Sequence, residues 1–160
     1  MTQFKNMPAH SRAWIYQSSK EFTENDKKIF HELSETFLEN WISHNKPVKG
    51  TIELFHSQFV VVLIDDLDDK VCGGSIDASQ RLMKELEQEL NVTLLDRMLA
   101  AYRKDGKIIS LPLHEFRILV ESGVLNENTI VFNNLVSTKE EFENNWEVPL
   151  KRSWHKQLIA

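Results

Sequence analysis

The residues with the clearest chemical potential lie in one short stretch, Val71 to Ser79. It contains the only cysteine of the chain and two of its five glycines, just ahead of an amphipathic run. Glycines before a helix let the backbone turn, and the free N–H groups at a helix start favour a negatively charged group. We therefore predict a site for a small anionic ligand at Gly73, Gly74, Ser75 and Asp77.

Cys72 has two interpretations. A thiol at the N-terminus of a helix has a lowered pKa, and the thiolate is then a candidate catalytic nucleophile or redox-sensitive group. Free cysteine is also among the most buried residue types, in which case the thiol is inert. His56 or His155 could act as the base of a thiol–base pair, but the sequence does not place either of them beside Cys72. The sequence leaves both interpretations open.

The helix that follows must position this stretch. Asp77 is expected to cap its N-terminus, with Gln80 three residues on, and Ser75 is an alternative cap. Gly73 and Gly74 are expected to turn with positive φ. The apolar residues recur at helical spacing: Leu82, Met83, Leu86 and Leu90.

Neither a metal nor a cofactor is expected. The six histidines include no pair at metal-ligand spacing on one predicted helix. The acidic run from Asp65 to Asp69 resembles a calcium loop, but Val71 stands where the turn glycine is needed and no glutamate closes the loop. We interpret the run as a solvated turn.

The first half of the chain predicts three strands and one long helix. Arg12 to Gln17 alternates in the manner of a strand, and Gly50 to His56 does the same. Phe59 to Ile64 is apolar at every position, which is typical of a central strand covered on both faces. Between the first two strands, Thr23 is expected to cap a helix that ends near His44.

The last third predicts a hairpin, a helix, a strand and a tail. Asp105-Gly106 is the strongest hairpin signal in the chain. Pro112 is suited to open a short helix, and Gly123 is suited to end it.

The order of these elements predicts an α+β protein. Strand, helix, strand, strand, helix, strand is the order of a ferredoxin-like βαββαβ core, which we assign to residues 1–104. The C-terminal extension, residues 105–160, is expected to pack on this core as part of a single compact unit. Trp146 and Trp154 are expected to be buried, because a tail with two tryptophans should dock on the body.

Composition narrows the function classes. The chain of 160 residues has a formal net charge of −5 and a single cysteine. The charge argues against binding to nucleic acid, and one cysteine suits a reducing compartment. No stretch has the length and apolarity of a membrane span, and the first residues lack an apolar signal segment. We expect a cytoplasmic protein that does not bind membranes.

Segments along nearly the whole chain resemble an uncharacterised bacterial family whose members are often labelled "ABC transporter ATPase". The label implies ATP hydrolysis. The residues that carry the resemblance are Pro8, His10 to Arg12, Trp14 to Gln17, Cys72 to Asp77, Asp96-Arg97, Val131 to Val136, Trp146 to Pro149 and Ser153 to His155.

The sequence does not support the activity that this label implies. Such an ATPase needs a glycine-rich loop ending in Gly-Lys-Ser/Thr, which cradles the phosphates. Only Gly106 is followed by a lysine, and Ile108 then stands where the magnesium-binding hydroxyl is required. The stretch after Val71 is similar to the signature loop of transporter ATPases, but Arg97 follows Asp96 where a catalytic glutamate is expected. ATPase activity is therefore disfavoured.

A shorter segment is similar to the second type of GYF-like domain, a small adaptor fold. The resemblance implies an interaction module. It rests on Gly106, Leu111, Glu115-Phe116, Leu119-Val120, Ser122-Gly123, Leu125, Thr129 and Val131.

The sequence as a whole favours a non-catalytic α+β protein that binds a partner protein or a small anionic ligand at the glycine stretch. The alternative is a thiol-dependent enzyme or redox sensor that uses Cys72. A homodimer is compatible with both functions.

Overall fold

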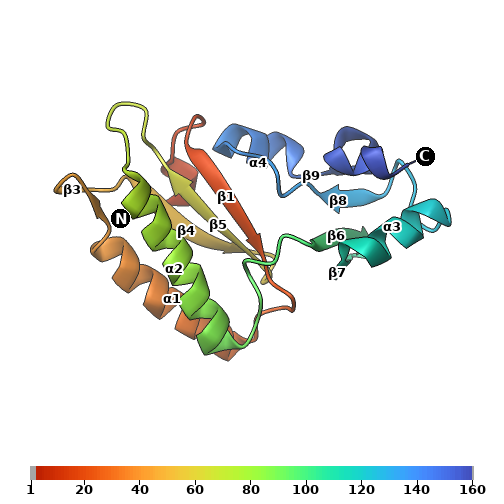
Figure 1. Cartoon of the computed structure of the whole chain (residues 1–160), viewed down its shortest axis with the longest axis horizontal. Helices are drawn as coiled ribbons and strands as arrows, with labels where there is room; N and C mark the ends of the chain where they lie inside the picture. Colours follow the sequence, from red (N-terminus) through yellow and green to blue (C-terminus); the bar gives the residue numbers. More distant parts are fainter. Residues whose placement is uncertain (1–2, 160) are drawn as a thin grey trace.

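The chain folds into three antiparallel sheets, and the two larger ones, of three and four strands, pack against each other. The structure, a computed structural model, describes residues 3–159. In chain order its elements are η1 (Phe4–Asn6), β1 (Arg12–Gln17), α1 (Glu24–Glu39), β2 (Ile42–Ser43), β3 (Lys46–Pro47), β4 (Gly50–Phe55), β5 (Phe59–Ile64), α2 (Gly73–Leu90), β6 (Leu99–Lys104), β7 (Lys107–Pro112), α3 (Leu113–Glu121), β8 (Ile130–Phe132), α4 (Lys139–Asn145), β9 (Glu147–Pro149), η2 (Leu150–Arg152) and η3 (Trp154–Leu158). Helices α1 and α2 lie beside the first sheet, and α3 lies beside the second (Figure 1).

The first sheet has the strand order β1-β5-β4, and both pairings are antiparallel. β5 is the central strand, and all six of its residues are buried, as its unbroken apolar run predicted. Successive side chains of a strand point to opposite faces. Trp14 and Tyr16 of β1 therefore pack toward the helices, while Ala13 and Ile15 pack toward the second sheet.

Helix α1 begins as predicted but ends earlier. The Thr23 hydroxyl accepts the N–H of Asp26, and the Asp26 carboxylate accepts the N–H of Thr23, which forms a capping box. The helix ends at Glu39 rather than near His44. Trp41 keeps the helical spacing of apolar residues, yet it lies beyond the helix, where it is buried and its indole N–H donates to the carbonyl of Ser75 at 2.9 Å.

The second sheet has the order β7-β6-β8-β9 and covers the face of the first sheet that α1 and α2 leave free. Its hairpin turn forms at Asp105 and Gly106, whose φ values of 51° and 78° suit the predicted Asp-Gly turn. One apolar cluster joins the two sheets. Its buried members are Met7, Ala13, Ile15, Phe59, Val61, Leu63, Ala101, Phe132, Val136, Phe142 and Trp146.

The α+β class is confirmed, but the ferredoxin-like topology predicted for residues 1–104 is wrong in its last strand. In that topology the strand after the second helix joins the first sheet beside β1. Here β6 pairs with β7 and β8 instead. The tight turn after β6 favours a hairpin between β6 and β7. At the free edge of β1, Arg12 forms an isolated antiparallel bridge with Thr138 instead. The predicted division between residues 1–104 and 105–160 therefore falls inside a hairpin.

The two tryptophans of the tail differ in burial. Trp146 is 5% exposed and packs between the sheets, which confirms its predicted burial. Trp154 is only half-buried and stacks on His155, with ring centroids 4.0 Å apart. The tail around it helps α3 to cover the outer face of the second sheet.

Candidate functional site

Cys72 lies at the N-terminus of an 18-residue helix. It is the N-cap of α2, with extended backbone angles, and the helix itself begins at Gly73. The Cys72 thiol is half-exposed and its Sγ atom lies 3.2 Å from the hydroxyl oxygen of Ser75. The backbone N–H of Cys72 donates to the hydroxyl of Ser43 at 3.0 Å. The predicted placement of Cys72 beside a helix start is confirmed.

This environment favours the thiolate. The contact with the Ser75 hydroxyl is the largest cause of a Cys72 pKa lowered from 9.0 to about 7, and the Ser43 hydroxyl is the next. The backbone N–H groups of Ser75 and Gly74 act in the same direction. The sulfur thus occupies the place at the helix start that the sequence assigned to an external anion.

The predicted caps and glycine conformations are wrong. Ser75 does not cap the helix, because its hydroxyl donates to the carbonyl of Ile42 at 2.6 Å. Asp77 is exposed and lies inside the helix rather than at its start. Gly73 and Gly74 are helical, and the only glycines with positive φ among residues 3–159 are Gly106 and Gly123.

The structure does not bring a histidine to the thiol. His155 is buried in the second half of the molecule, where its Nδ1 atom and the Ser153 hydroxyl lie 2.6 Å apart. His56 contacts the carboxylate of Glu147 at 3.1 Å. Within the described residues, Cys72 makes no hydrogen bond to a histidine, so a thiol–base pair is absent there.

A groove runs between α1 and α2, beginning at the Cys72 stretch. It has a volume of about 630 Å³, and two of the predicted ligand residues, Gly74 and Ser75, line it. Ile42 stands at one end with 58% of its surface exposed. The remaining lining residues are Leu33, Thr36, Phe37, Asn40, Trp41, Ala78, Arg81, Leu82 and Glu85.

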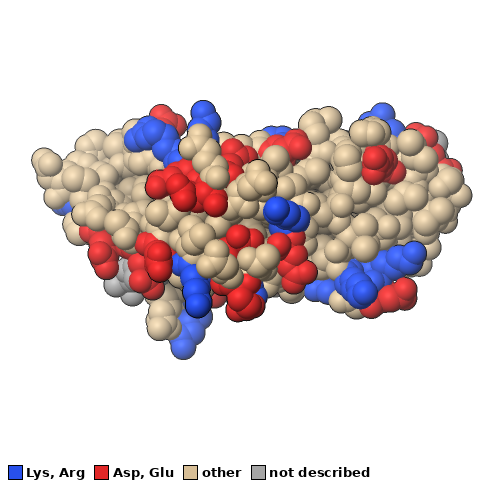
Figure 2. Space-filling model, turned by 90° about the horizontal axis from the view of Figure 1, so that it is seen from below, with Lys and Arg blue, Asp and Glu red and all other residues tan. Residues whose placement is uncertain are grey.

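The helices beside this groove are acidic. Together α1 and α2 contain nine acidic and four basic residues. Viewed from below, acidic side chains gather on the half of the molecule that carries these helices, with some basic side chains among them (Figure 2). The lining of the groove itself carries one cation, Arg81, and one carboxylate, Glu85, so the excess of carboxylates lies on the other faces of the two helices.

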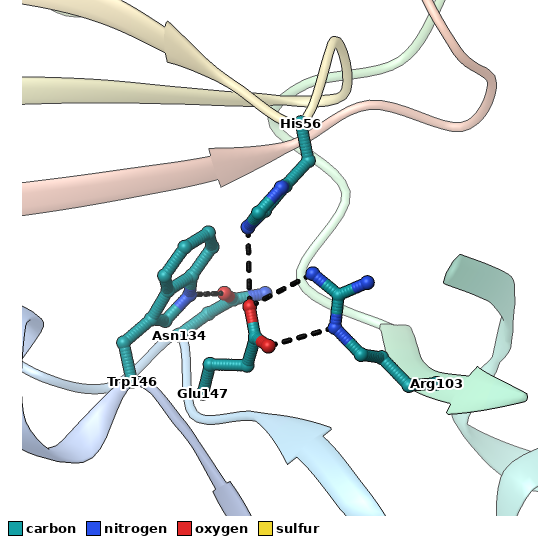
Figure 3. Close-up of polar contacts among 5 residues, drawn as sticks. All are labelled: His56, Arg103, Asn134, Trp146 and Glu147. Atoms are coloured by element: carbon teal, nitrogen blue, oxygen red, sulfur yellow. Dashed lines mark hydrogen bonds and ion pairs between the residues drawn. The ribbon is translucent and has the colours of Figure 1, made fainter. Parts of the chain in front are cut away.

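A second polar region lies between the two sheets (Figure 3). The Glu147 carboxylate accepts two hydrogen bonds from the Arg103 guanidinium, at 2.7 and 3.1 Å, and contacts His56 Nε2 at 3.1 Å. Arg103 is the main cause that holds the pKa of Glu147 below its usual value of 4.5. The His56 ring stacks on Trp146, with an interplanar angle of 17°. The β4–β5 turn is thereby tied to β6 and β9.

A chain of side-chain amides continues from Trp146. Its indole N–H donates to Asn134 Oδ1 at 2.9 Å, and the Asn134 amide donates to Gln17 Oε1 at 2.9 Å. Gln17 in turn donates to the carbonyl of Ala100 and to the hydroxyl of Ser110. We call the residues linked by these bonds and those around Glu147 the interlayer network. Sequence reasoning missed it, because one of its bonds joins residues 117 positions apart and no local spacing connects its members.

The acidic loop after β5 behaves as a turn held by basic neighbours. Arg12 pairs with Asp66 at 3.1 Å, and His10 contacts Asp65 at 2.8 Å. The contact with His10 is the main cause of a lowered Asp65 pKa. Among residues 3–159, no group of three His, Cys, Asp or Glu side chains is arranged to hold a metal ion.

Comparison with known proteins identifies no relative of this chain. No family model, no curated protein and no solved structure matches this chain. None of the helices in the described part of the chain is long and apolar enough to cross a membrane.

Proposed function

We propose that the protein is a non-catalytic binding protein whose α1–α2 groove receives a basic amphipathic helix of a partner protein. The observation that carries the proposal is an apolar groove between two helices that carry an excess of carboxylates. We keep the partner-binding function that the sequence predicted. The proposed binding site is now the groove, which begins at Gly74 and Ser75, rather than the glycine stretch itself.

The shape of the groove suits a helix. Gly74 to Glu85 form one wall, which extends about 18 Å at 1.5 Å per residue. Leu33 and Phe37 are half-buried and Ile42 is exposed, so apolar side chains are available to the anchors of a partner helix. Amphipathic helices place such anchors three or four residues apart when they bind in grooves.

The charge of the two helices that flank the groove favours a basic partner. Nine carboxylates against four cations on α1 and α2 attract basic side chains and repel acidic ones. The same charge disfavours a second copy of this helical face, because two acidic surfaces would then meet. A reducing compartment such as the cytoplasm remains our proposal for its location, supported by the single unpaired cysteine.

A designed peptide tests this function. A labelled helix of about 18 residues, with leucines along one face and lysines elsewhere, should bind with a Kd on the order of 10 µM by fluorescence anisotropy. Ile42→Lys should weaken binding at least about tenfold, because it places a cation in the groove. Ile118→Lys is a matched control, because Ile118 on α3 is 59% exposed and Ile42 is 58% exposed. Equal binding by both variants would show that the peptide binds elsewhere.

A redox-sensing thiol is the second candidate function. It is favoured by the half-exposed Cys72 thiol, whose pKa is lowered to about 7 by Ser75, Ser43 and backbone N–H groups. The rate of alkylation by iodoacetamide should reach half its maximum near pH 7. The pKa of an ordinary cysteine is about 8.5. An alkylation midpoint above this pH would exclude the redox-sensing function.

Hydrolysis of ATP is not proposed, despite the family label. The sequence lacks the Gly-Lys-Ser/Thr loop that cradles phosphates. Titration of magnesium-ATP by calorimetry should give no saturable heat at protein concentrations of tens of micromolar. Saturable binding in the low micromolar range would contradict this expectation.

A further inference from the structure

A small cavity lies where the first sheet, the loop before β6 and the C-terminal tail meet. Its volume is about 90 Å³. That is room for about three water molecules at roughly 30 Å³ each. The polar side chains that line it are Gln17, Asp96, Arg97, Asn134, Trp154 and His155.

His155 brings a buried donor to this cavity. The side chain is 1% exposed, and burial lowers its pKa to about 4, so the ring is neutral at neutral pH. In the tautomer in which the Ser153 hydroxyl donates to His155 Nδ1, Nε2 carries the ring proton. This Nε2–H makes no hydrogen bond within residues 3–159. A ring N–H that faces the cavity and has no protein acceptor is available to a bound acceptor.

Arg97 brings a positive charge. Its guanidinium carbon lies 6.0 Å from the centre of the Tyr16 ring, and it forms no ion pair with a carboxylate in the described part of the chain. Asn134 uses one of its two amide N–H groups for Gln17, and no bond within residues 3–159 engages the indole N–H of Trp154. Donors therefore outnumber acceptors on the polar part of the cavity wall.

We propose that this cavity binds a compact oxyanion, either a carboxylate or a phosphate group, with Arg97 and the Nε2–H of His155 as its principal donors. Planar guanidinium groups recognise both kinds of oxyanion through paired N–H donors. The volume excludes a large ligand, so the site accepts a free ion or the charged end of a small molecule. This site is separate from the proposed partner groove, and neither proposal depends on the other.

The walls of the cavity are held in place before a ligand arrives. Gln17 and Asn134 belong to the interlayer network, and Asn134 is fixed further by the indole of Trp146 (Figure 3). Preformed donors do not lose conformational entropy on binding, which favours a small ligand. Asp96 opposes an anion, but it is exposed and its Oδ1 atom already accepts the N–H of Met98 at 2.8 Å. Solvent screens much of its repulsion.

Nitrogen-15 NMR of the whole chain tests the proposal. Sodium acetate and sodium phosphate are titrated separately at neutral pH, with sodium chloride keeping the ionic strength constant. The ring nitrogens of His155 and the indole N–H of Trp154 should shift in a saturable way for at least one of the two salts, with a Kd on the order of 1 mM. The salt that saturates identifies the class of oxyanion.

Substitutions at three exposed residues test whether the oxyanion binds in this cavity. Arg97→Gln should raise the Kd at least about tenfold, because it removes the charged donor. Arg117→Gln removes the same charge from α3 and should leave the Kd unchanged, since Arg117 does not line the cavity. Asp96→Asn should lower the Kd about twofold to threefold by removing the repulsion. Shifts that stay linear to about 50 mM for both salts, or equal binding by Arg97→Gln, would overturn the proposal.

Discussion

The Cys72 stretch and the interlayer network are built in different ways. Cys72, Gly73, Gly74 and Ser75 are neighbours in the chain, and one helix start arranges them. The network instead joins side chains from β1, β6, β9 and the loops between strands, through bonds such as that between Gln17 and Asn134. The first region depends on local backbone geometry, and the second depends on the packing of the two sheets.

Because of this difference, the first region can affect the reactivity of the thiol, whereas the second affects the stability of the fold. The thiol of Cys72 is half-exposed and has its pKa set by groups within one helical turn and by Ser43, so its reactivity can change while the fold persists. Trp146 is buried among five rings of the interlayer region, and its removal opens the contact between the sheets. Substitutions in the two regions should therefore have very different costs.

Trp146→Ala should have the largest effect. It removes a ring whose centroid lies 4.6 Å from that of Phe142 and 5.0 Å from that of Phe59, and it leaves Asn134 without its indole donor. The free energy of unfolding should fall by about 4 kcal/mol, as for other buried tryptophans. Urea denaturation measures this. Trp154→Ala, at a half-buried ring, should cost roughly half as much; equal costs would contradict the assignment of Trp146 to the core between the sheets.

Gly50→Ala should have the next largest effect. A Cβ atom at Gly50 would lie 2.6 Å from Cζ3 of Trp41 and 2.8 Å from the carbonyl oxygen of Leu63. A backbone oxygen in a paired strand cannot move away easily, so the expected loss is about 2 kcal/mol. Gly73→Ala is the matched control, since nothing lies within 4 Å of its Cβ. It should be neutral or stabilising by up to about 1 kcal/mol, because alanine favours the helix. Thermal unfolding should rank the two variants in this order.

Glu147→Gln should have a smaller effect that depends on pH. Arg103 depresses the pKa of the folded Glu147 carboxyl below 4.5, so its contribution is fully present above the unfolded pKa. It is lost as the pH falls through the folded pKa. At neutral pH the variant should be less stable by about 1 kcal/mol, because the pair is partly solvated. Denaturation at a series of pH values should show this difference closing in acid; a constant difference would mean that the carboxylate charge is unimportant.

Ser75→Ala should have the smallest effect on stability and a clear effect on the thiol. The Ser75 hydroxyl is the main cause of the low Cys72 pKa, so its loss should move the alkylation midpoint upward from about 7. Ser79→Ala is the control, because Ser79 is also buried on α2 and its hydroxyl bonds only to the carbonyl of Ile76. An unchanged midpoint in Ser75→Ala would show that the Ser43 hydroxyl and the backbone N–H groups set the thiol pKa without the Ser75 hydroxyl.

The sequence predicted those parts of the fold that short-range rules govern. The N-cap at Thr23, the Asp105-Gly106 turn and the fully buried β5 each depend on residues a few positions apart. The end of α1 was misjudged because Trp41 fits the helical period, while its burial depends on a contact with Ser75. Periodicity records which residues are buried and does not record the element that buries them.

The site was predictable to the same extent. The position of Cys72 at a helix start follows from the glycines and the apolar period after them. The role of Ser75 does not, because its hydroxyl bonds to Ile42, 33 residues earlier in the chain. The prediction that β6 joins the first sheet was wrong for a similar reason. Both sheets offer an edge to which β6 could pair, and its position depends on the hairpin with β7 and on pairing with β8.

The most direct test of the proposed function is to locate the bound helix by NMR. Amide resonances of the nitrogen-15-labelled protein are followed while the unlabelled leucine–lysine peptide is added. We expect the largest shifts on α1 and α2 residues that line the groove, such as Phe37 and Ala78, and no shifts on α3 residues such as Ile118. Shifts centred on α3 or on the second sheet, with the α1–α2 groove unchanged, would contradict the proposed function.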